Sequence, residues 1–349
     1  MRLRALDSIR GLLLLQMTLD HFGKPISSYL FQCFGFFSAA EGFFFLSGFV
    51  GMFAAISKRE KDPSASWMRA RAFRIWKYHI ISLASLVCSS ILFLPALVPY
   101  FRGILQHPHT GSFLSALLIH TPTWLDVLPL YVILMLIGSF FFPRLARGSV
   151  YKIWLLSFLV WILAQFGIRE NIHALFPKWI NHGFFDLLGW QFIYFSGAAI
   201  AAWWKHHQKA KTTPHRFVQN ISYVAIFITI FLFLWSHQWI SLPLPSEFWI
   251  SREHLGPLRY LNFIAFALSI CFIVRTRPSL LDFQFSATLG KHSLEVYTAH
   301  TVLIYIWLIV PKYVHLHMPW NIIFPLFACF LLWLLAFILD VQKQKHKIL

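Results

Sequence analysis

The sequence predicts an all-α protein, a polytopic membrane bundle of about ten transmembrane helices with the N- and C-termini in the cytoplasm. Composition is the first observation: 58% of the residues are apolar and 12% are charged, whereas soluble domains average about 25% charged residues. Apolar runs of roughly 20 residues, the length of a membrane-spanning helix, recur along the chain. Lys and Arg gather in alternate connections, as the positive-inside rule expects of a multi-pass protein.

The predicted spans follow one another without a linker, so we expect residues 1–349 to form a single membrane domain. The spans are residues 8–24, 35–56, 78–99, 124–142, 151–168, 187–204, 217–236, 259–275, 290–310 and 320–340. With the N-terminus inside, 23 of the 30 Lys and Arg lie in cytoplasmic segments, Arg2, Arg59 and Lys211 among them. This split supports an even number of spans, and it explains the net charge of +17 without a nucleic-acid partner.

The first span carries ionisable side chains where lipid disfavours them. Asp7, Arg10 and His21 share one helical stripe, and Asp20 precedes His21. The second span adds Glu41. Ionisable residues at such depth are costly unless they pair or face a hydrated cavity, so we interpret them as functional. A histidine with a carboxylate partner can act as a general base, and either Glu41 or Asp20 could orient His21.

These side chains also have structural interpretations. His21 could be satisfied within the helix bundle, and Glu41 could be the counter-ion of Arg10. The second span carries small residues at helical spacing, namely Gly42, Ser47, Gly48 and Gly51. Such spacing favours close packing of the first two spans, which would itself bring His21 and Glu41 together.

Basic residues precede the third span, in the segment WMRARAFRIWKYH. Arg71, Arg74 and Lys77 lie at its cytoplasmic mouth. Topology and contact with anionic lipid would explain them. A phosphate clamp explains them equally well, because arginine matches phosphate in bidentate geometry.

The ninth span begins with the polar segment LGKHSLEVYTAH. Ser293, Tyr297 and His300 fall on one stripe of this helix. Lys291 and Glu295 are spaced as an i, i+4 pair that would stabilise the start of the helix. Polar groups at this density must face protein or a cavity.

Polar side chains interrupt other spans as well. They are Asp126, Trp190, Gln191, Arg259 and Asn262. Their number indicates a hydrated interior. The predicted outer connections 100–123, 169–186 and 237–258 are rich in His, Pro and Trp, and their aromatic faces would suit a carbohydrate.

The four cysteines lie in apolar segments without CxxC spacing and are interpreted as packing residues: Cys33, Cys88, Cys271 and Cys329. The chain also lacks an HExxH motif. We therefore expect no metal site.

Seven blocks, in this order, carry a resemblance to a known family: LDSIRG with DHF, AEGFFFLSGFVG, RARAFRIWKYH, WLDVLPLYVILML, GWQFIYFSGA, GPLRYLNF and LGKHSLEVYTAH. The chain resembles the OpgC family, the glucan succinyltransferases of the membrane acyltransferase-3 superfamily. Arg10 and His21 match the Arg and His that the superfamily carries on its first span. The resemblance implies a multi-pass acyltransferase of the bacterial inner (cytoplasmic) membrane, with no fused periplasmic domain.

That resemblance and the residues together give a mechanistic hypothesis. An acyl group, succinyl in first place, passes from cytoplasmic succinyl-CoA to a sugar hydroxyl of an osmoregulated periplasmic glucan. Acyl-CoA is then a co-substrate, and no tightly bound cofactor is expected. His21 acts as general base or as transient acyl carrier. Arg10 would receive the free carboxylate of a succinyl group.

The residues are divided among three roles. The catalytic group is His21, Glu41, Arg10 and Asp20. The group that binds the acyl donor is Arg71, Arg74, Lys77, Ser47, Ser293, Tyr297 and His300. The group that binds the acceptor is Asp126, Trp190, Gln191, Arg259 and Asn262.

Two alternatives remain open at this point. One is an O-acetyltransferase that modifies another cell-surface glycan. The other is a proton-coupled transporter or flippase, in which Arg10, His21 and Glu41 form a relay through the bundle. The oligomeric state is open, a homo-oligomer included.

Overall fold

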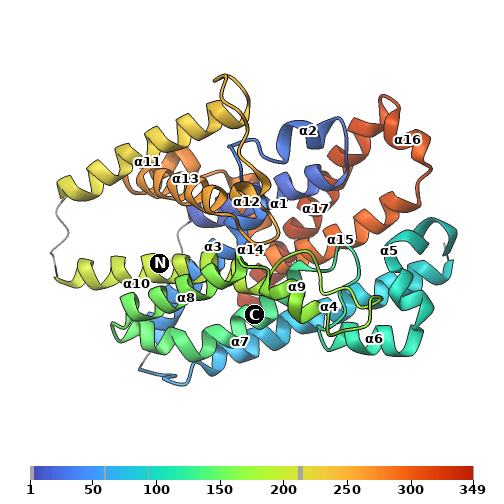
Figure 1. The fold of residues 1–349 in the computed structure, drawn as a ribbon, viewed down its shortest axis with the longest axis horizontal. Helices are drawn as coiled ribbons and strands as arrows, with labels where there is room; N and C mark the ends of the chain where they lie inside the picture. The colour runs from blue at the N-terminus through green and yellow to red at the C-terminus, as the bar shows by residue number, and fades with distance from the viewer. Residues whose placement is uncertain (1–3, 59, 93, 211–214, 349) are drawn as a thin grey trace.

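The computed structural model describes residues 4–348 except 59, 93 and 211–214, and this part of the chain is helical without any strand. Figure 1 shows the arrangement. The first six helices are α1 (Arg4–His21), α2 (Ile26–Leu30), α3 (Ala39–Lys58), α4 (Ser66–Leu92), α5 (Leu94–Gln106) and α6 (Pro108–Ala116). The next six are α7 (Val127–Ala146), α8 (Val150–Ala164), α9 (Ile168–His173), α10 (Leu187–Ala210), α11 (His215–Ser236) and α12 (Glu247–Ile250). The chain ends with α13 (Pro257–Thr276), the 3₁₀ helix η1 (Pro278–Leu281), α14 (Gln284–Lys291), α15 (Ser293–Ile309), α16 (Lys312–Leu316) and α17 (Trp320–Ile348).

Every predicted span falls on a helix, which confirms the all-α class. Within the described residues, five helices are long and apolar enough to cross a membrane: Ala39–Lys58, Val127–Ala146, Gln219–Ser236, Pro257–Thr276 and Trp320–Lys345. Two shorter apolar helices are Val150–Ala164 and Ser293–Ile309. The number of ten spans and the cytoplasmic termini stay predictions. Of the basic residues used for the topology, Arg2, Arg59 and Lys211 lie outside the described residues.

Two predicted spans are divided in the structure. The third, residues 78–99, covers the second half of α4 and the start of α5. The ninth is broken where α14 ends and α15 begins, because His292 has φ −111° and ψ 32°, outside the helical region. The predicted pairing of Lys291 with Glu295 is therefore wrong: Lys291 Nζ lies 3.2 Å from Asp340, and Glu295 accepts a hydrogen bond from Arg74.

Glycines bring α3 and α10 into close contact at the centre of the bundle. A Cβ at Gly48 would overlap the carbonyl oxygen of Tyr194, and a Cβ at Gly197 would overlap that of Phe45. The small residues of the second predicted span do serve helix packing, but Gly48 faces α10, whereas Gly42 faces Leu13 of α1. Only glycine permits backbones to approach this closely.

A second close contact sets the register between α1 and the α14–α15 segment. Cβ atoms at Gly11 and Gly290 would overlap the carbonyl oxygens of Ser286 and Asp7, respectively. The pairing of Gly11 with Ser286 and of Gly290 with Asp7 makes α14 antiparallel to α1. His300 lies beyond the break at His292, on α15, where it forms a hydrogen bond with His21 at the end of α1.

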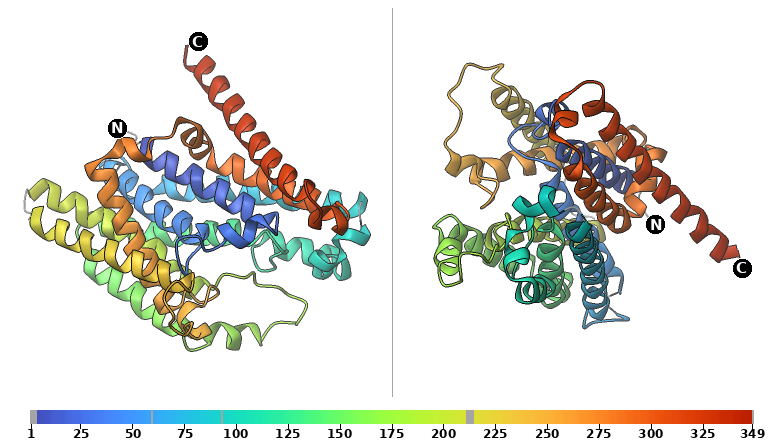
Figure 2. Two further views of the ribbon diagram at one scale, coloured as in Figure 1. Left: turned by 90° about the horizontal axis from the view of Figure 1, so that it is seen from above. Right: turned by 90° about the vertical axis from the view of Figure 1, so that its right-hand side faces the viewer.

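The chain directions are consistent with an even number of spans. Figure 2 shows that α1 and α17 run in opposite directions, so the start of α1 and the last turns of α17 lie toward one end of the molecule. Helices α5, α6 and α16 lie toward the other end (Figure 1).

Candidate active site

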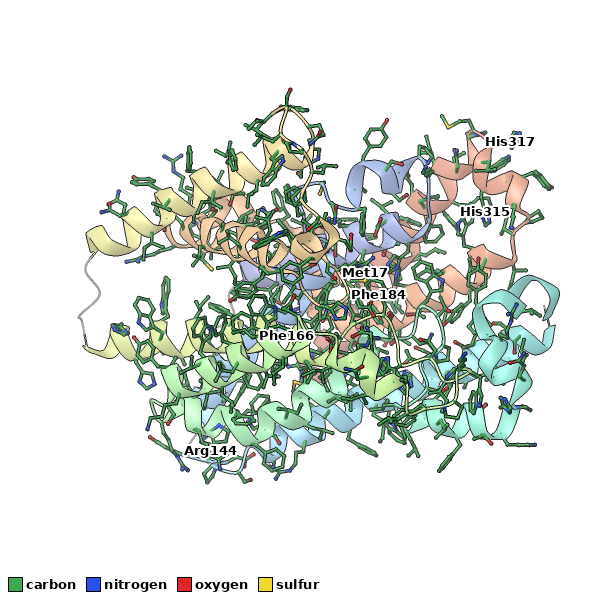
Figure 3. All side chains as sticks on the ribbon, in the orientation of Figure 1. Met17, Arg144, Phe166, Phe184, His315 and His317 are labelled. Atoms are coloured by element: carbon green, nitrogen blue, oxygen red, sulfur yellow. The ribbon has the colours of Figure 1, made fainter. Side chains whose placement is uncertain are left out.

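A cavity of about 240 Å³ lies where the end of α1 meets the start of α7 and the segment that precedes α13. Two of the lining residues, Met17 and Phe184, are labelled near the centre of the molecule in Figure 3. The lining residues are Gln16, Met17, Asp20, His21, Phe31, Ser38, Ala39, Ala40, Thr123, Trp124, Asp126, Val127, Phe184, Phe185, Arg252 and Tyr297. Asp20, His21, Asp126 and Tyr297, all predicted as site residues, thus meet at one place.

His21 forms a hydrogen bond with a second histidine. Its Nδ1 lies 3.1 Å from Nε2 of His300 on α15. His300 is 2% exposed, and its Nδ1 has no hydrogen-bond partner in the described part of the chain. The ring of Trp124 lies against His21, with the ring centroids 4.7 Å apart. The residue that orients His21 in this structure is therefore His300, which the sequence placed in the donor site.

Glu41 has a different partner from the one predicted. It forms an ion pair with Arg259 of α13, and both side chains are almost completely buried. Its other oxygen, Oε2, accepts hydrogen bonds from the Ser38 N–H at 3.0 Å and the Ser38 hydroxyl at 2.9 Å. Glu41 is thus engaged in an ion pair between α3 and α13, and the expected pairing of Glu41 with His21 or with Arg10 is wrong.

Arg10 lies away from the cavity. Its Nη1 atom is 3.5 Å from Oδ1 of Asp7 on the same helix. It precedes His21 by eleven residues, about 16 Å of helical rise. Arg10 is not among the described residues that line the cavity. The structure therefore gives no support to Arg10 as the group that receives an acyl carboxylate beside His21.

The residues assigned to the acyl donor follow α4 and α15, which pack against each other. Arg74 donates a hydrogen bond of 2.6 Å to Glu295 near the start of α15. Tyr297 reaches the cavity, and His300 bonds to His21. From Glu295 to His300 the helix rises about 7.5 Å. The basic side of α4 and the histidine pair are thus joined by α15.

The other donor residues have separate positions. Arg71 and Lys77 are exposed on α4. Ser293 begins α15 and is half-buried. Ser47 is buried, and its hydroxyl contacts the hydroxyl of Tyr131 on α7. Ser47 therefore joins helices α3 and α7 and does not line the cavity.

The five residues assigned to the acceptor do not form one group. Asp126 lines the cavity, and its Oδ2 accepts the Phe184 N–H at 3.3 Å. Gln191 is bonded to Ser157 on α8, with its Oε1 2.6 Å from the Ser157 hydroxyl.

Asn262, Trp190 and Arg259 also lie within the helix packing. Asn262 Oδ1 accepts the Phe36 N–H at 2.7 Å. Trp190 donates to the carbonyl oxygens of Arg252 and Glu253, at 3.0 and 3.1 Å. With Gln191 and the ion-paired Arg259, these residues hold the protein together, so the structure supports an acceptor role for Asp126 alone.

Among the cavity residues that the sequence interpretation missed, Trp124 and Arg252 carry donors that are unpartnered in the described part of the chain. Their buried nitrogens, Nε1 of Trp124 and Nε of Arg252, have no hydrogen-bond partner among the described residues. Both are obligate donors, so the partner that each lacks is an acceptor atom. The sequence signal for Arg252 was only its place in a predicted outer connection, where it counted as one of seven outer basic residues.

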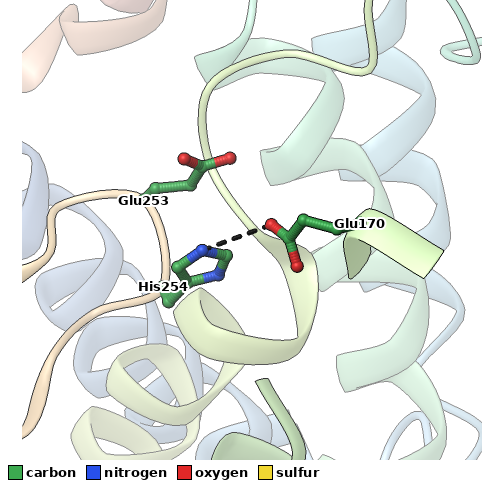
Figure 4. Close-up of side chains that lie close together, drawn as sticks. All are labelled: Glu170, Glu253 and His254. Atoms are coloured by element: carbon green, nitrogen blue, oxygen red, sulfur yellow. Dashed lines mark ion pairs between the residues drawn. The ribbon is translucent and has the colours of Figure 1, made fainter. Parts of the chain in front are cut away.

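An ion-pair network fixes the segment that carries Arg252. His254 lies between Asp186, 3.1 Å from its Nδ1, and Glu170, 3.3 Å from its Nε2. Figure 4 shows His254, Glu170 and Glu253 together. Within the described ranges these three could hold a metal ion, with ligand atoms within 4.8 Å of one another. Those atoms already have protein partners, since Glu253 also forms an ion pair with Arg169. We therefore interpret the cluster as a set of ion pairs that stabilises the predicted outer connections.

The class of protein that this fold defines is an all-helical membrane protein with an interior cavity whose largely apolar wall carries the ionisable side chains of Asp20, His21, Asp126 and Arg252. The chain belongs to the OpgC family: the model of that family, described as OpgC protein, matches residues 2–344. The resemblance seen in the sequence motifs is thereby confirmed at the level of the family. Membership indicates a glucan-modifying acyltransferase. No curated protein and no solved structure gives a significant match to the chain.

Proposed function

We propose that this protein transfers an acyl group, succinyl in first place, from cytoplasmic acyl-CoA to a hydroxyl group of a periplasmic glucan. It would do so as a ten-span protein of the bacterial inner membrane with both termini in the cytoplasm. The observation that carries the proposal is the His21–His300 hydrogen bond at the wall of the 240 Å³ cavity. A paired histidine beside a cavity with unpartnered donors is suited to acyl transfer.

The histidine pair determines which nitrogen acts. When His21 donates its Nδ1–H to Nε2 of His300, the Nε2 atom of His21 carries a lone pair. This nitrogen takes the proton of the glucan hydroxyl as the hydroxyl oxygen attacks the thioester carbonyl carbon. The tetrahedral intermediate then collapses, the carbon–sulfur bond breaks, and the CoA sulfur receives that proton from His21. His300 holds the tautomer, the role that a carboxylate has in a hydrolase triad.

Trp124 supplies the second catalytic element. Its ring contacts His21, and its indole N–H lacks an acceptor in the described structure. This donor would bind the thioester oxygen as negative charge develops on it. One such donor contributes about 10²–10³-fold in known oxyanion sites. Asp20 and Asp126 offer acceptor oxygens in the same cavity for the hydroxyl groups of the glucan.

Acyl-CoA would approach from the predicted cytoplasmic side, opposite to the glucan, along α4 and α15. Exposed Arg71 and Lys77 are available to its phosphates, while Arg74 is partly neutralised by Glu295. The acyl group would then follow α15 past Tyr297 to the histidine pair. The covalent variant, in which His21 first takes the acyl group, uses the same geometry.

The test is an assay of purified protein with radiolabelled succinyl-CoA and a glucan acceptor, following CoA release and label on the glucan. We expect His21→Ala to lower turnover by about 10²–10⁴-fold. His317→Ala is the matched control, because His317 is exposed on the far edge of the molecule (Figure 3). Full activity in a correctly folded His21→Ala protein would refute the mechanism. Absence of turnover with any acyl-CoA would favour the transporter.

A further inference from the structure

We propose that Arg252 selects the acyl group, by binding the free carboxylate at the far end of a succinyl chain while its thioester lies beside His21. This inference rests on the proposed acyltransferase function and assigns a specificity-determining residue to it. The cavity of about 240 Å³ has the volume of roughly eight water molecules at about 30 Å³ each. A four-carbon acyl group fits into such a space.

Among the residues that the structure describes, no anion is bonded to the Arg252 cation. Within the described residues it has no ion pair within 4.0 Å, and its buried Nε has no hydrogen-bond partner. Its guanidinium group instead lies 5.1 Å from the ring centroids of Phe31 and Phe184, and 5.7 Å from that of Phe185. Aromatic rings hold a guanidinium in place but leave its N–H groups free for a planar acceptor.

The other arginines near the site are already paired. Arg259 is bonded to Glu41, and Arg10 lies next to Asp7. Arg252 differs from both in lining the cavity itself. It is therefore the arginine that a carboxylate in the cavity can reach.

Nearby carboxylates keep Arg252 charged without satisfying it. Burial lowers the pKa of the Arg252 guanidinium, whereas the carboxylates of Glu41, Asp20 and Asp126 raise it and Arg259 lowers it further. An arginine stays protonated through such shifts. Asp20 and Asp126 line the same cavity but lie beyond ion-pair distance from Arg252 among the described contacts. A bound carboxylate could form the bidentate contact that these two do not form.

The backbone around Arg252 is fixed in advance of binding. Three side chains donate hydrogen bonds to backbone carbonyl groups of this segment: one from α8, one from the residue that follows α8, and one from α10. Trp190 donates to Arg252 and Glu253, Trp161 donates to Leu255 at 2.8 Å, and Gln165 donates to His254 at 2.9 Å. A segment held this way presents its arginine without ordering a loop, which favours selective binding.

The experiment compares succinyl-CoA with butyryl-CoA, which has the same carbon skeleton without the terminal carboxylate. We expect Arg252→Gln to lower kcat/KM for succinyl-CoA by about 10- to 100-fold and to leave butyryl-CoA turnover within about twofold. Arg252→Lys should retain part of the succinyl preference, because it keeps the charge but loses the bidentate contact. Arg102→Gln is the matched control, because Arg102 is exposed and lies in another predicted outer segment.

Equal losses with both donors, or no loss with succinyl-CoA, would overturn the assignment of Arg252. Binding of the two CoA esters, measured by calorimetry, separates this inference from the proposed function. If the wild type shows an Arg252-dependent preference for succinyl-CoA but no transfer, the carboxylate site stands and the transferase mechanism fails. If it shows transfer without that preference, the mechanism stands and the carboxylate site is refuted.

Discussion

The ion pair between Glu41 and Arg259 makes a strong prediction about stability. Glu41 and Arg259 are 0% and 1% exposed, and two donors of Ser38 complete the coordination of the carboxylate. Glu41→Gln keeps the shape of the side chain and removes its charge. Arg259 then remains as a buried, uncompensated cation. Breaking a buried pair from one side costs about 3–5 kcal/mol.

The expected result is a thermal midpoint lowered by roughly 5–15 °C. The measurement is unfolding of the purified protein in detergent, followed by tryptophan fluorescence. A double variant, Glu41→Leu with Arg259→Met, removes both charges and should recover most of the loss, because apolar pairs of similar volume replace buried ion pairs at little cost.

A second measurement, the pH dependence of activity, tests whether Glu41 is separate from the catalytic histidine pair. Since its oxygens are bonded to Arg259 and Ser38, the pH dependence of CoA release by folded Glu41→Gln should match that of the wild type. The reasoning would be refuted by a variant of unchanged thermal midpoint whose pH–rate profile is displaced. That outcome would indicate that Glu41 orients His21, as the sequence predicted.

Three further predictions concern other parts of the molecule. Gly48→Val should prevent stable folding, measured by size-exclusion chromatography, because the valine side chain would overlap the backbone of α10. Gly148→Val is the control, because Gly148 has open space around it and a positive φ, so this variant measures the effect of backbone strain without a steric clash. Burial, and then the nearby His182, lowers the pKa of His173 to about 4. The unfolded chain therefore binds the extra proton first, and α9 should lose protection as pH falls from about 6.5 to 4; hydrogen exchange corrected for intrinsic pH effects should show this in the wild type and much less in His173→Phe. Trp190→Phe removes the donor that holds the carbonyl of Arg252, so the preference for succinyl-CoA over butyryl-CoA should fall several-fold while butyryl-CoA turnover persists.

The helices were predictable because their cause is local. Apolar runs of membrane length are visible in the sequence itself, and the predicted spans fall on helices, although residues 78–99 and 290–310 are each divided between two. The break at His292 was not predictable, since the polar segment LGKHSLEVYTAH satisfies the helical period across it. Next to the break, Gly290 lies against the backbone of Asp7 on α1, a tertiary contact that the period of the segment does not reveal.

The sequence predicted which residues lie in the site better than it predicted which of them are in contact. A stripe of polar residues within an apolar helix must face protein or a cavity. His21, Asp126, Tyr297 and His300 were assigned on this ground to three separate roles, and the structure brings them to one region. Which of them touch depends on how each helix is rotated about its axis. Periodicity on one helix carries no information about the rotation of another, and for that reason Glu41 was assigned to His21 although Arg259 takes its carboxylate.

Arg252 shows the limit of reasoning from hydropathy. An arginine inside an apolar run, such as Arg10, attracts attention because its burial follows from its neighbours in the sequence. Arg252 stands in a connection, where arginine is common, and it becomes a cavity residue only because Trp190, Trp161 and Gln165 draw the carbonyl groups of its segment onto α8 and α10. Its side chain then lines the cavity. If carboxylate selection depends on this fold of the connection, weakening any one of these three hydrogen bonds should reduce the preference for succinyl-CoA, even though none of the three donors touches the acyl group.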